Sequence, residues 1–381
     1  MIIKSIDLQN FRNYELQKID FDSGTNILYG DNAQGKTNIL EAVYLSGTTK
    51  SHRGSKDQEM IAFNHNESHI KMIMNRKGID YRIDMHIKRN RSKGIAINGV
   101  PIRKSMDLYG IINLVIFSPE DLRIIENGPS ERRKFIDMEL CQLDKIYASN
   151  LINYRKTLEQ RNNLLRDISF NPSLEDTIDV WDMQLIRYGR EIIARREKFI
   201  DQLNDIIKDI HIRLSGGKEN LLVKYVPDAK EDEFEDILSR NRERDIRMKY
   251  TCAGPHRDDM IFYIDELDVH KYGSQGQKRT SALSLKLAEI EIVKQLTGDK
   301  PVLLLDDVLS ELDSSRQNYL LNSISDVQTI ITCTGLDEFI NNRFDLNRIF
   351  RVSEGHVYQE NKLQELSLIH ISEPTRRVVI S

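Results

Sequence analysis

The sequence is poor in the features that mark several large classes of protein. Only 3 of its 381 residues are cysteine, and Cys141, Cys252 and Cys333 lie far apart. This spacing argues against a disulfide scaffold or a cysteine zinc site and favours a reducing compartment. No apolar run approaches the length of a membrane helix, and the start of the chain lacks the apolar stretch of a signal peptide. These absences predict a cytoplasmic protein with no membrane segment.

The composition allows a large core but offers little net attraction to nucleic acid. Hydrophobic residues make up 39% of the chain and charged residues 30%, which suits one large domain or two ordinary ones. The formal net charge of −4 argues against indiscriminate binding to nucleic acid. A negative net charge does not exclude a local basic patch, which depends on where the basic residues lie.

The first third of the chain predicts strands on both sides of a glycine-rich loop. Residues 1–30 have partial alternation, and the strand 25–29 runs directly into the loop, after which we expect a helix over 37–46. Residues 68–102 alternate as an antiparallel unit, in which Asn98-Gly99 is a strong hairpin turn. Residues 111–117 predict one further buried strand.

The middle of the chain predicts long helices. Apolar residues recur at helical spacing over 151–168 and again over 178–214, with Pro172 between the two runs. The second helix would be about 37 residues and roughly 55 Å long. An antiparallel arm and a plain helical bundle explain this pattern equally well.

Charge accumulates over 231–249, which predicts a surface linker. Residues 302–305 and 330–332 are apolar and predict strands of a parallel sheet.

The loop at 30–37 reads GDNAQGKT and matches the phosphate-binding motif G-x-x-x-x-G-K-[ST] between a strand and a helix. Its glycines let backbone N–H groups turn toward phosphate oxygens, and the helix N-terminus adds its positive dipole. Lys36 would neutralise the β- and γ-phosphates, and the Thr37 hydroxyl would ligate Mg²⁺. The predicted nucleotide-binding residues of the loop are Gly30, Asp31, Asn32, Ala33, Gln34, Gly35, Lys36 and Thr37.

The run VLLLDD at 302–307 supplies the acidic partner of that loop. Four apolar residues predict a buried strand whose carboxyl end presents two carboxylates at the edge where ligands bind in open α/β sheets. Asp306 is the expected Mg²⁺ ligand. Asp307 is the expected catalytic group, together with Lys36, because it can orient or polarise the attacking water.

Three further segments narrow the class of ATPase. Ser274, Gln275 and Gly276 precede a helix over 281–296 and form a signature-like string just before the acidic strand. Residues 310–313 follow that strand at the spacing of a D-loop, and Cys333-Thr334 ends the next strand. This order is that of the ABC and SMC ATPase heads, in which the signature of one subunit covers ATP bound by the other. It predicts an ATP-dependent homodimer.

The chain also closely resembles the bacterial RecF family over residues 1–365. The resemblance is specific as a set and rests on LQNFRNY (8–14), KSHR (50–53), FSPEDL (117–122), SERRKF (130–135), AGPHRDD (253–259) and LDDVLSELD (305–313).

The resemblance implies an α/β fold: a P-loop ABC-type ATPase head, with a mixed sheet and an antiparallel subdomain, plus a smaller helical second domain that has an antiparallel helical arm. The head would comprise 1–117 and 250–365, and the helical domain 118–249. It also implies that Arg12 contacts the nucleotide.

At the level of function, the resemblance implies weak ATP hydrolysis and ATP-dependent dimerisation on DNA. It implies recognition of single-strand/double-strand junctions at gaps, cooperation with RecR and RecO, and loading of the RecA recombinase. These activities would serve gap repair, replication restart and the SOS response.

Some positions depart from the wider ABC pattern. Residues 118–121 occupy the place of a Q-loop but contain no glutamine, Asp307 stands where transporters have glutamate, and Thr334 where they have histidine. These departures agree with the RecF pattern and argue for slow hydrolysis. Two alternatives remain beside a repair ATPase: a nucleotide-gated DNA scaffold whose hydrolysis is dispensable, and the ATPase subunit of a transporter.

Basic clusters are the candidate DNA contacts, since lysine and arginine bind phosphates by counterion release without reading sequence. A solvated surface explains any one of them as well. Arg257 would serve the ATP site, the domain junction or an ion pair with Asp258 or Asp259. The clusters are Lys50/His52/Arg53, Lys88/Arg89/Arg91/Lys93 and Arg132/Arg133/Lys134.

The last stretch, residues 366–381, has no counterpart in the RecF pattern. It resembles the translation of a sequencing adapter, so we expect a non-native tail. An ordinary disordered tail is the competing interpretation.

Overall fold

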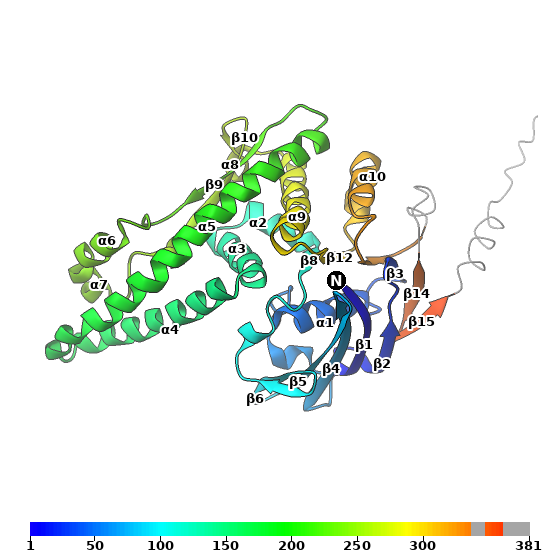
Figure 1. Ribbon diagram of the computed structural model, residues 1–381, viewed down its shortest axis with the longest axis horizontal. Coiled ribbons are helices and arrows are strands. Elements are labelled where there is room, and N and C mark those ends of the chain that lie inside the picture. The colour runs from blue at the N-terminus through cyan, green and yellow to red at the C-terminus, as the bar shows by residue number, and fades with distance from the viewer. Residues whose placement is uncertain (337–346, 361–381) are drawn as a thin grey trace, which may run out of the picture. The chain divides into compact units, whose positions relative to one another are not determined.

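The computed structural model describes residues 1–336 and 347–360 (Figure 1). The predicted non-native tail therefore lies outside the described residues. The chain divides into two compact units. Unit 1 contains residues 1–102 and the part of the chain from Val302 onward, and unit 2 contains residues 103–301. Within the described ranges, no helix is long and apolar enough to cross a membrane.

Unit 1 contains an antiparallel sheet formed by the first third of the chain. Alternation places one set of side chains in the core, as in β4, where Ile70, Met72 and Met74 are buried. The predicted Asn98-Gly99 turn joins β6 to β7 with positive φ at both residues. The strand order is β2 (Tyr14–Asp20), β1 (Ile2–Phe11), β4 (Glu67–Arg76), β5 (Ile79–Lys88), β6 (Arg91–Ile97) and β7 (Val100–Ile102).

The second sheet of unit 1 is mainly parallel and combines both ends of the chain. β3 (Thr25–Tyr29) lies between β13 (Thr329–Cys333) and β14 (Arg348–Ser353), and β12 (Val302–Asp306) pairs with β13. β15 (His356–Glu360) adds antiparallel to β14. The apolar strands β3, β12 and β13 are buried throughout except for Tyr29, as expected for a parallel sheet.

Helix α1 (Lys36–Thr48) is nearly all buried because it packs against strands of both sheets, β1, β4 and β5 on one side and β12 and β13 on the other. Unit 1 is completed by α10 (Ser314–Ser323) and by short 3₁₀ turns at Asp57–Met60 and Leu309–Glu311. The N-terminus of α1 is thereby fixed against the carboxyl end of β3.

Unit 2 is mostly helical and contains the predicted arm. Helices α4 (Lys145–Ile168) and α5 (Ile178–Leu214) run side by side and are joined by a turn at Pro172–Thr177 (Figure 1). The antiparallel helical arm is therefore confirmed, and α5 is 37 residues long. Pro172 begins the turn, where its missing N–H breaks no helical hydrogen bond.

The rest of unit 2 packs around α5. Helix α9 (Gln275–Thr297) crosses it, and a small antiparallel sheet in the order β11 (Leu267–Asp268), β10 (Asp259–Ile264), β9 (Leu221–Val226) lies alongside. The remaining elements are β8 (Leu114–Phe117), α2 (Leu122–Glu126), α3 (Pro129–Leu143), α6 (Phe234–Arg240), α7 (Arg242–Met248), α8 (Val269–Tyr272) and 3₁₀ turns at Ser105–Asp107, Pro119–Asp121 and Pro255–Arg257.

The prediction of a surface linker over 231–249 is wrong. The segment forms α6 and α7, which bury Phe234, Leu238 and Asp245 against the arm. Asp245 accepts a hydrogen bond of 2.6 Å from Nη1 of Arg161, which is itself fully buried. Charge density misled the prediction because one acidic residue of this run is neutralised inside unit 2 rather than by solvent.

The two compact units do not follow the predicted domain segments. Residues 250–301, including Ser274, belong to unit 2, whereas the other half of the predicted C-terminal head segment belongs to unit 1. The segments 1–117, 118–249 and 250–365 thus stay a proposal about functional parts, and the units are a description of packing.

A buried arginine joins the arm to the elements beside it. Arg196 of α5 donates to Asp137 Oδ1 at 2.7 Å and to Asp258 Oδ2 at 2.8 Å, and also to the carbonyl of Pro255 at 2.6 Å. Its Nε donates to the Tyr147 hydroxyl at 3.1 Å. The guanidinium is therefore satisfied by α3, α4 and the turn that precedes β10, which makes it the polar centre of unit 2.

We expect Arg196→Met to destabilise unit 2 by about 3–5 kcal/mol, because two buried carboxylates would lose the positive charge that is buried between them. Urea denaturation followed by circular dichroism measures the change in the free energy of unfolding. Arg195→Met is the matched control, since Arg195 is more exposed and lies 3.4 Å from Asp144. We expect Arg195→Met to lower the free energy of unfolding by less than ~1 kcal/mol. An equal loss of stability in the two variants would contradict the prediction.

Candidate nucleotide-binding site

The predicted phosphate loop connects β3 to α1 in unit 1 and has a backbone that only small residues tolerate. Gly30, Ala33 and Gly35 have φ values of 148°, 64° and 110°. A Cβ at Gly30 would lie 2.3 Å from the carbonyl oxygen of Val352, and one at Gly35 would lie 2.5 Å from Asn13 Nδ2. The motif glycines are thus required by their positive φ and by the close approach of the Val352 backbone at Gly30 and of the Asn13 side chain at Gly35.

Lys36 turns back into the loop that precedes it. Its Nζ donates to the carbonyls of Gly30 at 2.5 Å and Asp31 at 2.7 Å. Burial lowers the pKa of Lys36, and the nearby carboxylates of Asp307 and Asp306 offset part of this effect. A concave loop with an ammonium group at its centre has the shape and charge to hold phosphate oxygens.

The acidic strand meets the loop through a shared hydrogen-bond acceptor. Asp306 Oδ1 accepts from the Thr37 hydroxyl and from the Thr332 hydroxyl, both at 2.8 Å. Asp306 and Thr332 are register partners in β12 and β13, and Thr37 is in the first turn of α1. The structure therefore brings both predicted metal ligands together, and an oxygen pair of this kind suits Mg²⁺.

Asp307 follows the end of β12 and is held with a positive φ of 53°. Its backbone N–H donates to the hydroxyl and the carbonyl of Thr332, at 3.0 Å and 3.3 Å. Burial raises the pKa of the Asp307 carboxyl, Lys36 lowers it and Asp306 raises it further. A carboxylate whose pKa is raised is a better proton acceptor, which is what orientation and polarisation of a water molecule require.

Arg12 forms a tight pair with a residue that the sequence did not reveal. Its Nε and Nη2 donate to Glu41 at 2.8 Å and 2.9 Å, and Nη2 also donates to the Ser55 hydroxyl at 2.6 Å. Glu41 lies on α1 and is fully buried. Burial raises the pKa of Glu41, but hydrogen bonds from Arg12 and Ser51 lower it to a net value below normal. The guanidinium is thereby anchored to the helix that begins with the phosphate loop.

The outside of the loop is supported by two turns. Asn13 Nδ2 donates to the Gln34 carbonyl at 2.9 Å, and the N–H of Glu354 donates to Gln34 Oε1 at 2.6 Å. Asp31, Asn32 and Ala33 at the tip are exposed. The supporting residues come from the β1–β2 and β14–β15 turns, so no local sequence signal identifies them. Thr332 has one weak signal, a hydroxyl near the carboxyl end of a mostly apolar strand.

Two predicted segments extend from the same strand ends. The Ser310 hydroxyl donates to the Asp307 carbonyl at 2.8 Å, and Asp313 caps α10 by accepting from the N–H of Arg316. Thr334 directly follows β13 and is exposed. Residues of the predicted D-loop and switch thus follow the acidic strand and its neighbour, as expected.

The predicted signature residues belong to unit 2. Ser274 is the N-cap of α9, where its Oγ accepts from the N–H of Gln277 at 3.2 Å while Gln277 Oε1 accepts from the N–H of Ser274 at 2.9 Å. This capping box starts the helix at Gln275, earlier than predicted. Ser274, Gln275 and Gly276 are exposed.

Part of the third basic cluster has a structural role. Arg132 is buried and donates to both carboxylate oxygens of Asp259, at 2.6 Å and 2.9 Å, and Arg133 donates to the carbonyl of Asp258. Arg132 is therefore withdrawn as a DNA contact. Asp258 and Asp259 do not pair with Arg257, which lies 3.9 Å from Asp228 instead.

Comparisons with known proteins agree with this geometry. The family model for the RecF/RecN/SMC N-terminal domain matches residues 2–357. The DNA replication and repair protein RecF of Lachnospira eligens is 62% identical over 95% of the chain and 100% of its own length. The protein of the same name from Agathobacter rectalis is 63% identical over 94% of the chain and 99% of its own length.

Solved structures give the same result. The recombination mediator protein RecF with ATP, described as part of the RecFOR pathway, matches with a TM-score of 0.88 at 36% identity, over 94% of this chain and 98% of that one. The Smc head domain of Pyrococcus furiosus matches with a TM-score of 0.56 at 16% identity, over 97% of this chain and 99% of that one, and shows the shared fold. The predicted ABC-type head with a helical second domain is confirmed.

We expect Glu41→Gln to destabilise unit 1 by about 3 kcal/mol at neutral pH, because the partly buried guanidinium of Arg12 would lose its fully buried charged partner. The pKa of Glu41 is lower in the folded chain than in the unfolded chain. Its stabilisation is therefore complete at neutral pH and declines as the pH falls through the acidic range.

Denaturant titrations from pH 7 down into the acidic range measure this effect. The difference in the free energy of unfolding between wild type and Glu41→Gln should become smaller as the pH falls, because glutamate is protonated in the acidic range and glutamine does not titrate. Glu15→Gln, at an exposed position of β2, is the matched control and should stay close to wild type throughout. A constant difference between wild type and Glu41→Gln at every pH would refute the assignment.

Proposed function

Because the chain belongs to the RecF family, within the group that shares the RecF/RecN/SMC N-terminal domain, we propose that it is an ATP-dependent DNA-binding protein of recombinational repair. The single observation that carries the nucleotide part is the convergence of Lys36, Thr37, Asp306 and Asp307 at one edge of the parallel sheet. The transporter alternative is dropped, because the family placement is with DNA replication and repair proteins.

We assign the phosphate loop, residues 30–37, to the triphosphate of ATP, as its relative in complex with ATP suggests. Lys36 would exchange its two carbonyl partners for phosphate oxygens, which carry more negative charge. Thr37 and Asp306 would hold Mg²⁺, the aspartate in part through water, because this ion keeps several of its water ligands. Bound Mg²⁺ would neutralise charge on the phosphates as the γ-phosphoryl group is transferred to water.

Arg12 would contact the nucleotide as well. It is already fixed on the helix that starts the loop, through the Glu41 pair. A pre-oriented guanidinium loses little entropy when it binds phosphate. Gln34, held from two sides, would keep the loop open in the shape that the phosphates need.

The second half of the ATP site would come from another copy of the chain. The Ser274 hydroxyl oxygen accepts a backbone hydrogen bond, so its hydrogen is left to donate. It sits at the positive end of α9, with exposed Gln275 and Gly276 beside it. A γ-phosphate bound to a second subunit is the partner that this arrangement suits. ATP would then join two copies as a homodimer.

Hydrolysis would be slow, and it would separate the two subunits and release them from DNA. Asp307 is proposed to orient the attacking water, with a shorter reach than the glutamate of transporters. An alternative is that ATP binding performs the function and hydrolysis is dispensable, so that the protein is a nucleotide-gated DNA scaffold.

On DNA, we propose that the dimer recognises the shape of single-strand/double-strand junctions at gaps. Apart from Arg132, all members of the three basic clusters remain candidate phosphate contacts. The exposed ones are Lys50, Arg53, Arg89, Arg91 and Lys134. Because a solved relative is a mediator of the RecFOR pathway, RecR and RecO are the proposed partners. Loading of the RecA recombinase in gap repair, replication restart and SOS induction is the proposed outcome.

We predict that the ATPase rate per subunit rises with protein concentration and with gapped duplex DNA, because each site needs two subunits. Lys36→Met removes the charge that holds the phosphates, and Ser274→Arg blocks the face that covers them. Each variant alone should be inactive.

A mixture of the two variants should regain activity, because a heterodimer contains one intact pair of surfaces. The double variant Lys36→Met/Ser274→Arg, mixed with itself, is the control and should stay inactive. An inactive mixture, together with a wild-type rate that is independent of concentration, would overturn the composite site but leave nucleotide binding intact.

Asp307→Asn should keep ATP binding and dimerisation but lower the steady-state ATPase rate at least ~100-fold, since the proton acceptor is lost. Size-exclusion chromatography with ATP and a phosphate-release assay measure the two effects. Asp20→Asn, an exposed carboxylate of unit 1, is the control. Normal repair of damaged DNA in cells that carry Asp307→Asn would favour the scaffold alternative.

A further inference from the structure

The outer face of the antiparallel sheet in unit 1 carries a group of metal-ligating side chains that nucleotide binding does not use. In β4, Ser68 and Ile70 face the core, so Glu67 and His69 share the opposite face. His69 is the register partner of His86 in β5. Alternation and register therefore place two imidazoles and one carboxylate on one face.

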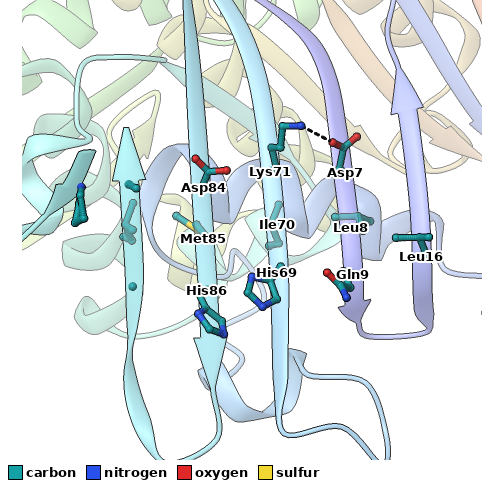
Figure 2. Close-up of a pocket in the computed structure, with 14 residues that line it drawn as sticks. Asp7, Leu8, Gln9, Leu16, His69, Ile70, Lys71, Asp84, Met85 and His86 are labelled. Atoms are coloured by element: carbon teal, nitrogen blue, oxygen red, sulfur yellow. Dashed lines mark ion pairs between the residues drawn. The ribbon is translucent and has the colours of Figure 1, made fainter. Parts of the chain in front are cut away.

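The three side chains are close enough to share one ion. His86 Nε2 lies 2.9 Å from Glu67 Oε2, and His69 Nε2 lies 3.9 Å from Glu67 Oε1. The two imidazole rings stack with centroids 3.9 Å apart and planes 24° apart. One ligand atom from each residue lies within 4.8 Å of the others. Figure 2 shows the two rings next to each other on neighbouring strands.

We propose that Glu67, His69 and His86 form a binding site for Zn²⁺ or a similar divalent transition-metal ion. Two imidazoles with one carboxylate are a ligand set of zinc sites that keep a fourth position open. Tetrahedral zinc with bonds of about 2.1 Å places its ligand atoms roughly 3.4 Å apart. The observed separations of 2.9 Å and 3.9 Å lie on either side of that value.

The donor types select the class of ion. Mg²⁺ and Ca²⁺ prefer oxygen ligands, whereas imidazole nitrogen favours zinc, nickel and copper. The site therefore differs in chemistry from the Thr37/Asp306 pair, which offers only oxygen. Because strands β4 and β5 fix the relative positions of the ligands, metal binding would need only small side-chain rotations.

An open hollow adjoins the two imidazoles. Gly94 is the register partner of His86 on β6, and its missing side chain leaves the next position on this face empty. The hollow has a volume of about 470 Å³, and His69, His86, Gln9 and Gly94 are among its lining residues (Figure 2). Water or a small donor ligand has room to occupy the fourth position of the ion.

One neighbouring charge opposes the ion. Lys88 Nζ lies 3.5 Å from Glu67 Oε2, so its ammonium competes for the carboxylate. Loss of this charge should strengthen metal binding, whereas it would weaken a cluster that serves only as a set of ion pairs. This difference separates a metal site from a structural salt bridge.

The test uses the full chain without a histidine tag, free of nucleotide, titrated with Zn²⁺ in competition with a chromophoric indicator. We expect one tight site per chain. His69→Ala and His86→Ala should each weaken the affinity for Zn²⁺ at least ~10-fold. Loss of a residue that only hydrogen-bonds to a metal ligand already has an effect of about that size. Glu67→Gln should weaken the affinity less, and Lys88→Gln should strengthen it.

Two controls keep the result specific. His65→Ala removes a partly buried histidine just before β4 and should leave the affinity unchanged. Asp306→Asn alters the proposed Mg²⁺ site and should also retain the zinc site. Substitution by Co²⁺ adds a second readout, a visible absorption band typical of tetrahedral coordination, which His86→Ala should abolish.

The proposal is overturned if wild type binds no stoichiometric Zn²⁺, or if His69→Ala and His86→Ala bind it as tightly as His65→Ala does. A Lys88→Gln variant with weaker Zn²⁺ binding would also count against it. Glu67, His69, His86 and Lys88 all lie on the outer face of the sheet. Circular dichroism checks that each variant, including the two controls, is folded.

Discussion

The shared hydrogen-bond acceptor at Asp306 is the interaction on which the rest of the site depends. One carboxylate oxygen holds Thr37, at the start of α1, and Thr332, in the strand beside it, both at 2.8 Å. Thr332 in turn holds the backbone of Asp307 in its left-handed conformation. Three segments from distant parts of the sequence are thereby aligned at one sheet edge, and any ligand at the loop must meet the carboxylates.

Buried ion pairs also fix the positions of elements in both units. In unit 1, Glu41 fixes Arg12 to the helix that follows the phosphate loop. In unit 2, Arg196 and Arg161 are buried among carboxylates that come from several helices. Pairs like these cost desolvation energy, and they specify geometry because their hydrogen bonds are directional. The protein is proposed to form a dimer when ATP binds and to dissociate after hydrolysis. Each unit must keep its own shape during this cycle.

The family relationship and the geometry support different parts of the proposed function. High identity over nearly the whole chain places it among RecF proteins, and this carries the proposals about DNA repair and partners. The positions of Lys36, Asp307 and Ser274 carry the proposals about ATP and a second subunit. The Glu67, His69 and His86 cluster depends on neither, because it follows from strand alternation and register on a face that the proposed nucleotide site does not include.

Much of this protein was predictable because its signals are local. Residues 30–37 and 302–307 identify a phosphate loop and its acidic strand by residue type and order, and alternation or helical spacing predicted the sheets and the arm. The tertiary structure decided which charges are buried. Asp245 and Arg132 look like surface residues in the sequence, and Glu41 and Thr332 give little or no signal, because their partners lie between 26 and 127 residues away. Folding alone brings those partners together, and the energy of a charge depends on what surrounds it.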